Sequence, residues 1–473
     1  MPEPVSRRMR RTVVVAIALL AGGVTALPVA NATTTTPSVR QDFNGDGYED
    51  LATGVPWGRV NGLRSAGYVA VVYGSANGLT SGTKKVYTQE SPGIPGTVEA
   101  HDMFGAHLTV GDLDADGYAD LVVETDNEQW VHDGIARDGN RIVLWGGKGG
   151  LTSGTVLPVL STAPGQGGTS LTGDFNGDGH LDLARRDDVR FGPFGRDGAA
   201  ASVQKGVRFA ESGQVTALAA GDTDGDGISD IVSVAFSGSD SEYRLIHHMS
   251  VLRGSRDGLL PPATLEGGES RSKQWNQSLA IGDLDGDGRA EVVSSSGNAL
   301  RIFRGTEGGP ATTPQVITQD TPGVPGAHEE EDSFGYNVSV GDVDGDGYGD
   351  ILAGNWTESF GGLTYAGNFA VVPGGPAGPT GAGTKVFSQA SASVPGTAEA
   401  RDHFGGDTHL LDSDGDGRAE PIVAAPGENN WNGGLWAFRS TSAGATAKGS
   451  VSFGARSFGM TVNGDRFGDH LPD

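Results

Sequence analysis

Seven short acidic segments are the part of this sequence whose residue types and spacing could do chemistry. In each segment Asp or Asn stands at positions 1, 3 and 5, Gly follows position 5, and Asp or Glu stands at position 9. Oxygen-bearing side chains alternating along a sharply turning backbone can surround a hard cation such as calcium, which takes six to eight oxygen ligands. The segments are residues 42–50, 112–120, 174–182, 222–230, 283–291, 342–350 and 412–420.

The other positions of the segments fit the same interpretation. Gly at position 6 permits the positive φ that such a turn needs. Position 7 varies in chemistry, which fits a ligand supplied by the backbone carbonyl, where the side chain has no role. We therefore predict up to seven bound Ca²⁺ ions. The predicted ligands are Asp42, Asn44, Asp46, Tyr48, Asp50, Asp112, Asp114, Asp116, Tyr118, Asp120, Asp174, Asn176, Asp178, His180, Asp182, Asp222, Asp224, Asp226, Ile228, Asp230, Asp283, Asp285, Asp287, Arg289, Glu291, Asp342, Asp344, Asp346, Tyr348, Asp350, Asp412, Asp414, Asp416, Arg418 and Glu420.

An EF-hand and a metal-free acidic turn both fit the segments less well. An EF-hand begins with the same spacing but needs a Glu at position 12 and a helix on each side. Position 12 holds no acid, as Thr53, Val123 and Ser233 illustrate, and the flanks have the composition of strands. Metal-free acidic turns would explain one copy, since Asp and Gly favour turns. Seven copies that keep the same four positions favour metal binding.

The segments recur about every sixty residues, which indicates a repeat architecture. An alternating apolar run precedes each segment, a short aliphatic run follows it, and two more strand-like runs complete the unit, as in residues 68–74 and 85–88. Four short strands with glycine-rich turns are typical of one propeller blade. The expected fold is all-β, a seven-bladed β-propeller of four-stranded antiparallel blades, with a calcium loop between the first and second strands. Residues 33–473 would form this single domain.

These residues resemble the FG-GAP repeat of the integrin α-chain propeller and of many secreted bacterial proteins. Phe104-Gly105, Phe334-Gly335 and Phe404-Gly405 match the Phe-Gly element before the loop. Gly54-Val55-Pro56 and Ala424-Ala425-Pro426 loosely match the element after it. The resemblance implies a calcium-binding propeller of the kind found in adhesive ectodomains and lectin-like proteins, and fold alone does not settle function.

The C-terminus departs from the repeat. Ser457-Phe458-Gly459 precedes an incomplete eighth segment, with Thr461 at its position 1 and Arg466 at its position 6, that should bind no metal. The first repeat has little sequence before Asp42 to serve as its opening strand. We expect residues 451–471 to pair with the first repeat and close the ring, which removes exposed sheet edges. A ring of eight blades is the alternative.

The N-terminus and the composition indicate export. Arginines at positions 7–11, an apolar stretch and Ala30-Asn31-Ala32 describe a signal peptide of residues 1–32, by either the general or the twin-arginine route. An uncleaved membrane anchor is the alternative. Cleavage removes four Arg and one Glu, so the net charge falls from −26 to −29. Such an acidic, extracellular chain should bind neither nucleic acid nor anionic membranes, and we expect a monomer that does not insert into membranes.

Loop tryptophans are the predicted ligand contacts. If the calcium loops are first turns, the second turns and the links between blades lie on the opposite face. Tryptophans there would offer stacking platforms to a glycan or anchors to an extracellular protein. Trp145 and Trp436 lie in predicted strands and should be core. The predicted ligand-binding residues are Trp57, Trp130, Trp275, Trp356 and Trp431.

The sequence favours a binding or adhesion module over an enzyme. It has no Cys, no Gly-x-Ser-x-Gly and no His-Glu-x-x-His, and its ten histidines are scattered. We assign no catalytic residue. The enzymatic alternative is a calcium-dependent polysaccharide lyase on the same fold.

Overall fold

The computed structural model describes Met1 and residues 40–132, 135–157, 170–185, 188–210, 213–239, 244–270, 275–296 and 298–472. The chain divides into two compact units, Met1–Thr34 and Thr35–Asp473. The predicted signal peptide therefore lies outside the described residues, and the fold below is that of the second unit. Within the ranges described, no helix has the length and apolar character to span a membrane.

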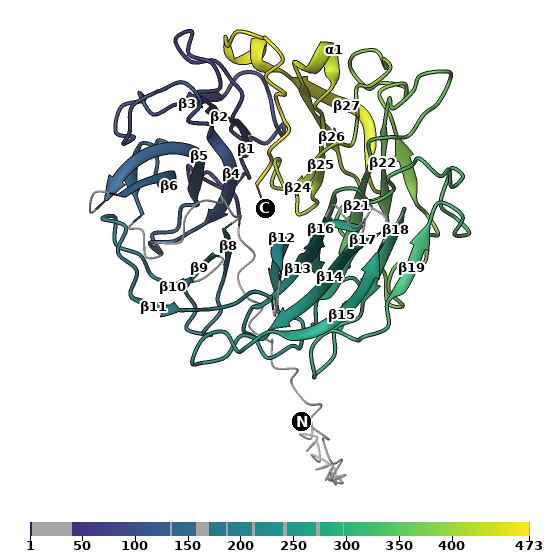
Figure 1. Cartoon of the computed structure of the whole chain (residues 1–473). Coiled ribbons are helices and arrows are strands. Elements are labelled where there is room, and N and C mark those ends of the chain that lie inside the picture. Colours follow the sequence, from purple (N-terminus) through teal and green to yellow (C-terminus); the bar gives the residue numbers. More distant parts are fainter. Residues whose placement is uncertain are drawn as a thin grey trace. The chain divides into compact units, whose positions relative to one another are not determined.

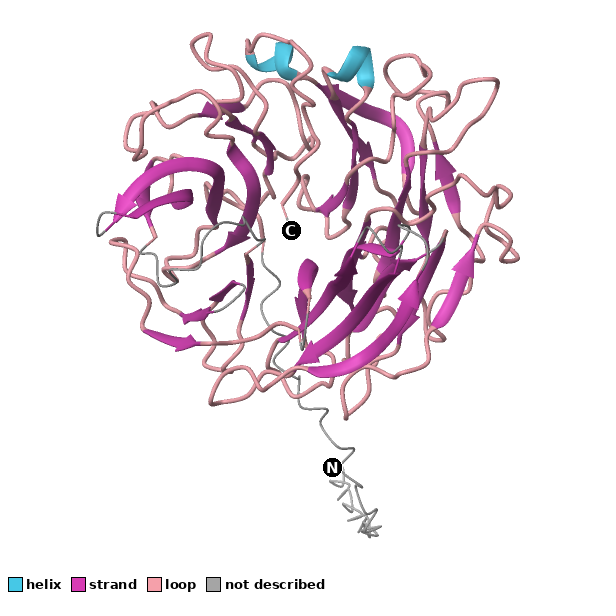
Figure 2. Cartoon of the chain, in the orientation of Figure 1, coloured by secondary structure: helices cyan, strands magenta, loops and turns pink. Residues whose placement is uncertain are grey.

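The unit is a seven-bladed β-propeller, and the eight-bladed alternative is wrong. Figures 1 and 2 show seven antiparallel sheets arranged around a centre. The first blade contains β1 (Leu51–Val55), β2 (Tyr68–Val72) and β3 (Lys84–Tyr87). The second contains β4 (Phe104–Gly111), β5 (Asp120–His132), β6 (Ile135–Trp145) and β7 (Ser153–Val156). The third contains β8 (Leu171–Gly173), β9 (Asp182–Arg185), β10 (Asp188–Phe191) and β11 (Ser202–Lys205).

The remaining four blades have four strands each. The fourth contains β12 (Gln214–Gly221), β13 (Asp230–Ser239), β14 (Arg244–Leu252) and β15 (Ala263–Ser270). The fifth contains β16 (Trp275–Gly282), β17 (Glu291–Ser296), β18 (Ala299–Phe303) and β19 (Gln315–Thr318). The sixth contains β20 (Val338–Gly341), β21 (Asp350–Asn355), β22 (Asn368–Val372) and β23 (Lys385–Phe387). The seventh contains β24 (Thr408–Leu411), β25 (Glu420–Ala425), β26 (Gly434–Arg439) and β27 (Thr446–Phe453), with the short helices α1 (Glu428–Trp431) and η2 (Ala455–Phe458).

The middle strands are mostly apolar because both faces of each blade are covered by neighbouring blades, although β10 carries the buried Arg190. In β2, Tyr68, Ala70 and Val72 join the cluster between the first and seventh blades. Val69 and Val71 point the other way and join the cluster between the first and second blades. Because successive side chains point to opposite faces, one strand contributes to two separate hydrophobic clusters.

The predicted position of the acidic segments is confirmed. In blades two to seven each segment connects the first strand to the second, for example residues 112–120 between β4 and β5. The second strand then carries the chain to the opposite end of the blade. At about 3.3 Å per residue, the five residues of β1 span ~17 Å. The acidic segments and the turns after the second strands therefore lie at opposite ends of the blades.

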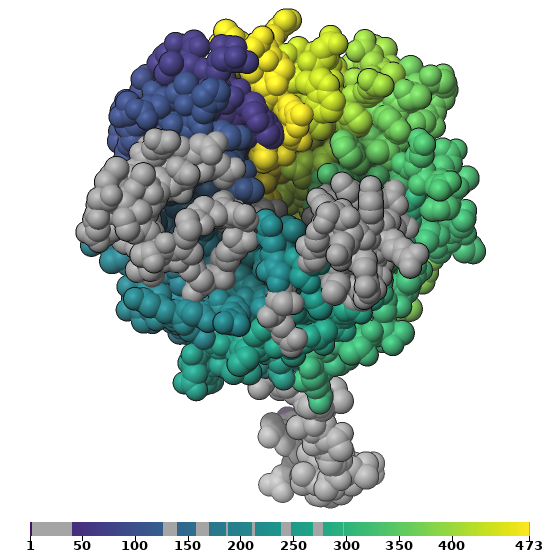
Figure 3. All heavy atoms as spheres, in the orientation of Figure 1, coloured from purple at the N-terminus to yellow at the C-terminus, as the bar shows by residue number. Residues whose placement is uncertain are grey.

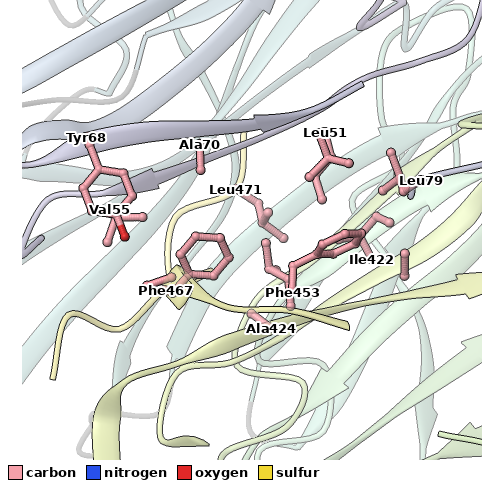
Figure 4. Packing of buried hydrophobic residues seen from close by; sticks show 14 of the residues in the cluster. Leu51, Val55, Tyr68, Ala70, Leu79, Ile422, Ala424, Phe453, Phe467 and Leu471 are labelled. Carbon is pink, nitrogen blue, oxygen red and sulfur yellow. The ribbon is translucent and has the colours of Figure 1, made fainter. Parts of the chain in front are cut away.

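The end of the predicted closing segment 451–471 completes the first blade, which has only three strands of its own, whereas residues 451–453 belong to β27 of the seventh blade. The Gly54 amide donates to the His470 carbonyl at 2.8 Å, and the Thr53 hydroxyl donates to the same oxygen. Phe467 and Leu471 face β1 and β2 in the buried cluster of Figure 4. In Figure 3 the yellow C-terminal surface adjoins the purple first blade. Chain ends more than 400 residues apart thus form one blade.

The Phe-Gly element of this blade differs from the expectation. Gly433 forms a parallel bridge with Phe467, as Gly67 does with Phe104 and Gly367 with Phe404. Phe467-Gly468 is therefore the Phe-Gly element of the first blade, displaced to the C-terminus. Ser457-Phe458-Gly459 instead contributes to η2, so no eighth repeat begins there. The shared pattern is Asp-x-Phe-Gly, which ends at Gly105, Gly335, Gly405 and Gly468.

The innermost strands enclose a central cavity of about 380 Å³. Its wall includes Val110 of β4, Ala220 of β12 and Val340 of β20. In the cavity wall, half-buried His409 contacts Gln41, with 3.2 Å between Nε2 and Oε1. Burial lowers the pKa of His409 to about 4, so its ring is neutral at neutral pH.

Ring closure predicts a large effect of Phe467→Ala. Phe467 is fully buried, and removing a buried phenyl ring costs about 3–5 kcal/mol. We expect the midpoint of urea unfolding, followed by tryptophan fluorescence, to fall clearly below that of the wild type. Arg456→Ala, at an exposed position of η2, is the control and should leave the midpoint unchanged. A Phe467→Ala midpoint equal to that of the control would contradict closure by this segment.

Candidate metal loops and ligand pocket

Each acidic segment is organised by the carboxylate at position 1. In the first segment Asp42 Oδ1 accepts a hydrogen bond from the Gly45 amide at 2.7 Å, and Oδ2 accepts one from the Gly47 amide at 2.8 Å. Gly47, at position 6, has φ of +91° and open space around it, so it is present for its conformation. These bonds wind the backbone around the carboxylate, as the sequence interpretation requires.

The carboxylate at position 9 is buried in every segment and joins separate parts of its blade. Asp120 Oδ2 accepts from the Leu113 amide, at position 2 of the same segment, at 2.9 Å. Its Oδ1 accepts from the Gly146 amide, directly after the third strand, at 2.8 Å. Each oxygen retains a lone pair for a cation. The same two bonds are made by Asp50, Asp182, Asp230, Glu291 and Asp350.

Glu420 at position 9 of the seventh segment departs from this pattern. Ser440 stands where the other blades have Gly after the third strand. Glu420 Oε2 accepts from the amide and the hydroxyl of Ser413, at 2.9 and 2.7 Å. Its Oε1 is buried and has no hydrogen-bond partner within the described part of the chain. A cation at this segment would satisfy that oxygen.

Burial raises the pKa of every position-9 carboxyl because the charged form loses its hydration. The pKa of Asp50 rises to about 8, and that of Asp120 to about 7. Without a cation these groups would be partly protonated at neutral pH. Such buried carboxyls are suited to a ligand that supplies positive charge. The pKa is about 7 for Asp182, Glu291 and Glu420, and about 6 for Asp230 and Asp350.

Backbone hydrogen bonds connect six of the seven neighbouring pairs of segments, the pair 112–120 and 174–182 being the exception among the described residues. The amide of position 8 donates to the carbonyl of position 1 in the preceding segment, as Ala119 does to Asp42 at 2.9 Å. Glu49 donates to Asp412 at 3.1 Å, so the first segment is bonded to the last. We call this set of bonds the loop belt. It also contains Ser229 to Asp174, Ala290 to Asp222, Gly349 to Asp283 and Ala419 to Asp342.

The side chain at position 7 packs against the preceding segment, although its chemistry varies from one segment to the next. It covers the glycine at position 4 of the preceding segment. A Cβ on Gly45 would meet the Tyr118 ring, and one on Gly177 would meet Ile228. The side chain therefore matters for packing between blades, contrary to our expectation that only the carbonyl counts.

Five segments bring three carboxylates together closely enough to hold a metal ion. In each, one oxygen per residue lies within 4.8 Å of the others. The donors are oxygens alone, which fits a hard cation such as Ca²⁺ and not a nitrogen- or sulfur-preferring metal. The segments 42–50 and 174–182 have Asn at position 3 and so one carboxylate fewer. The clusters are Asp112-Asp114-Asp120, Asp222-Asp224-Asp226, Asp283-Asp285-Glu291, Asp342-Asp344-Asp350 and Asp412-Asp414-Glu420.

Arginines, which the sequence reasoning missed, pair with position 3 in four of these five clusters. Arg304 Nη2 lies 2.7 Å from Asp285 Oδ2, and Arg196 Nε lies 2.6 Å from Asp114 Oδ2. The segment 342–350 has no such ion pair among the residues described. Arg253, Arg304 and Arg439 all stand at or directly after the end of a third strand, which is the signal that could have revealed them. The other two pairs are Arg253 with Asp224 and Arg439 with Asp414.

Three of the five predicted tryptophans converge at the opposite ends of the blades. Trp356 follows β21, Trp431 ends α1 and Trp57 follows β1, so they belong to the sixth, seventh and first blades. The ring centroids of Trp356 and His403 are 4.7 Å apart, and those of His403 and Trp431 are 5.3 Å apart. The Arg466 guanidinium lies 4.7 Å from the Trp431 ring and 5.0 Å from the Trp57 ring. We call this row the aromatic ladder.

The intervening residues of the ladder occupy one repeat position. His403 and Arg466 are each the x of an Asp-x-Phe-Gly element and have φ of +57° and +51°. The left-handed backbone projects each side chain between the tryptophans of adjacent blades. Sequence reasoning missed both residues, although the fourth Asp-x-Phe-Gly, at residues 465–468, was the available signal.

Two cavities flank Arg466. The first, which we call the tryptophan pocket, has a volume of about 470 Å³ and is lined by Tyr336, Trp356, Trp431 and Asp469, among others. Tyr336 stacks on Trp356 at 4.7 Å. Trp356 Nε1 is buried and lacks a hydrogen-bond partner within the described ranges.

The second cavity, the arginine pocket, has a volume of about 290 Å³. It lies on the Trp57 side of Arg466. Its lining includes Trp57, Arg59, Arg64, Asp465 and Arg466.

The other two predicted ligand-binding tryptophans, Trp130 and Trp275, lie in strands. Trp130 lies within β5 and Trp275 begins β16, so neither stands in a turn or a link between blades as expected. Both strands extend further than the sequence indicated, and the two side chains lie outside the described residues. Trp145 and Trp436 are 1% and 3% exposed, which confirms that they belong to the core.

Two family models match the chain at the repeats. The FG-GAP repeat matches residues 33–72, and the FG-GAP-like repeat matches residues 283–353. Both spans contain an acidic segment and the strand that follows it. The chain is an FG-GAP repeat β-propeller protein. No curated protein is similar to it in sequence.

Three solved structures are similar in part. A lectin of Agrocybe aegerita that recognises non-reducing terminal N-acetylglucosamine is 14% identical, with a TM-score of 0.35 over 91% of this chain and 84% of that one. BBS1N in complex with ARL6DN is 11% identical, with a TM-score of 0.38 over 70% and 78%. The Photorhabdus luminescens Tc holotoxin pore is 15% identical, with a TM-score of 0.32 over 79% of this chain and 17% of that one.

The raised pKa values predict that the metal-free propeller loses stability as the pH rises. A carboxyl whose pKa is higher in the folded state favours folding while it is protonated, and this contribution is lost as the pH passes the folded pKa. For the position-9 groups the loss begins near the unfolded pKa of about 4 and is complete near pH 8, so part of it falls between pH 6 and pH 8. In chelator, the melting temperature should fall between pH 6 and pH 8. In millimolar calcium the fall should be smaller, and equal falls in both buffers would contradict the prediction.

The arginine pairs predict unequal metal affinities. Arg304→Met removes a positive charge beside Asp285 and should tighten calcium binding at residues 283–291 about two- to fivefold, as expected for an exposed ion pair. Calorimetric titration of calcium into the chelator-treated protein measures the change. Arg208→Met, at an exposed site before β12, is the control. Weaker binding in Arg304→Met would show that the arginine supports the metal instead of competing with it.

Proposed function

We propose that this FG-GAP propeller is an exported, calcium-stabilised binding module whose ligand is a glycan, held in the tryptophan pocket. The observation that carries the proposal is the convergence of Trp356 and Trp431 from two blades on a 470 Å³ cavity, with Trp57 of a third blade lining the adjoining one. Aromatic rings beside convergent polar groups are the usual lining of a small-ligand site. The propeller fold alone would not specify a site for a small ligand.

A glycan suits the pocket better than a protein surface. A stable protein interface needs about 800 Å² on each partner and exposed apolar anchors. Of the ladder tryptophans only Trp431 is among the exposed large hydrophobic residues, at 38%. A sugar needs less area and offers an apolar ring face together with hydroxyl groups. Those hydroxyls could donate to Asp469, which lines the same cavity, and a shift of the Trp356 ring would bring its buried Nε1 within reach as a donor.

Calcium acts as scaffold in this proposal. The acidic segments lie at the opposite ends of the second strands from the aromatic ladder, so an ion there would not touch the ligand. Bound Ca²⁺ would hold position-1, position-3 and position-9 carboxylates together and reinforce the loop belt. All seven segments are proposed to take Ca²⁺, those with Asn44 and Asn176 included, because an amide oxygen is also a calcium ligand.

Export is supported by the signal-peptide pattern of residues 1–32. Without disulfides, rigidity outside the cell would come from size and from metal. We propose that the protein is extracellular and monomeric.

A glycan array screened with purified protein in calcium tests the function. We expect binding to a defined set of glycans and at least a tenfold loss of affinity in Trp356→Ala, because the variant loses both the stacked ring and the indole donor. Leu260→Ala is the matched control, at an exposed residue near the calcium-loop ends. A wild-type protein that binds no glycan would refute the proposal. Turnover of acidic polysaccharides, followed at the absorbance of unsaturated products, would favour the lyase instead.

A further inference from the structure

The arginine pocket concentrates positive charge on a strongly acidic chain. Arg59, Arg64 and Arg466 line it together with a single acid, Asp465. The chain as a whole carries −26. Because charges at physiological salt are screened over about 8 Å, the local cluster decides what binds there.

Two of the three guanidinium groups are held in place by neighbours. With the Asn463 amide assigned in the orientation that satisfies its neighbours, its oxygen accepts from Arg59 Nε and Nη2 at 3.1 and 3.2 Å. Arg466 lies between Trp57 and Trp431 and is 3.7 Å from Asp469. Arg64 has no ion pair among the described residues and is exposed at the mouth of the pocket. Pre-ordered guanidinium groups of this kind suit a planar, bidentate anion.

Asp465 supplies the second observation. Its residue is only 2% exposed, and Oδ2 has no hydrogen-bond partner within the described part of the chain. Buried polar atoms are nearly always satisfied, so this oxygen points to a missing donor. A ligand hydroxyl would supply it. The negative charge of Asp465 would repel a doubly charged phosphate more strongly than a singly charged carboxylate.

We propose that the arginine pocket binds a carboxylate-bearing sugar, such as a uronic acid residue of an acidic polysaccharide. The sugar carboxylate would pair with Arg59, Arg64 and Arg466, a neighbouring hydroxyl would donate to Asp465, and Trp57 would form the apolar wall. Arg466 also lines the tryptophan pocket. The two cavities are therefore neighbouring subsites for successive sugars of one chain. This inference rests on the proposed glycan function and specifies its ligand class.

The test compares oligogalacturonates with their methyl esters by calorimetry on the full mature chain in calcium. Esterification removes the charge and leaves the ring, so the wild type should bind the ester at least tenfold more weakly. Arg64→Gln should weaken binding of the acid form and leave binding of the ester unchanged. Arg256→Gln, at an exposed turn near the calcium-loop ends, removes the same charge and should change neither. Melting temperatures confirm that the variants fold.

The outcomes separate the two proposals. Equal binding of acid and ester, with the Trp356→Ala loss intact, would overturn the carboxylate assignment and leave the glycan function standing. Binding of no saccharide of either kind would refute both. Competition by glucose 6-phosphate stronger than by glucuronate would also overturn the assignment, because it would show a phosphate site. Asp465→Asn gives a last check, since weaker binding of both acid and ester is expected from the lost hydroxyl acceptor.

Discussion

The buried carboxylate at position 9 of each acidic segment is the interaction on which the rest of the propeller depends. Burying a carboxylate away from water costs free energy unless hydrogen-bond donors replace its lost hydration. In six blades two backbone amides do so, one from the start of the segment and one from the chain after the third strand. One side chain therefore fixes the first, second and third strands at the same end of the blade. The raised pKa values show that two amides do not fully compensate, and a divalent cation would.

The loop belt extends this local constraint to six of the seven neighbouring pairs of segments. Because the position-8 amide donates to the preceding segment, the conformation of one segment sets the position of the next blade. The bond from Glu49 to Asp412 joins the first segment to the last at one end of the blades. At the other end the bond from Gly54 to His470 joins the same two blades through the C-terminal segment. Residues near both chain termini thus hold together the first and seventh blades, which carry Trp57 and Trp431 of the aromatic ladder.

Much of the propeller fold could be predicted from the sequence because the acidic segment that organises each blade is local and recurs in every repeat. Seven copies of one spacing predicted the blade number, the acidic clusters and the place of the loops between strands. Features that depend on contacts between blades were missed. The side chain of Tyr118 was judged irrelevant because its partner, Gly45, lies about seventy residues earlier. Arg466 was assigned to a degenerate metal segment because spacing within the repeat, and not the Asp-x-Phe-Gly pattern, guided the alignment. Trp130 was placed in a turn because strand length follows from pairing with β6, which periodicity does not report.

Hydrogen exchange at the loop belt, measured by mass spectrometry with and without calcium, is the most direct test of this account. The peptides to follow contain the position-8 amides Ala119, Ala290 and Ala419, which donate between blades. The account predicts that chelation speeds their exchange more than tenfold, while amides in the centres of the middle strands, such as Val71 in β2, change much less. Exchange at the belt that is equally slow with and without calcium would contradict the claim that bound cations hold the blades together.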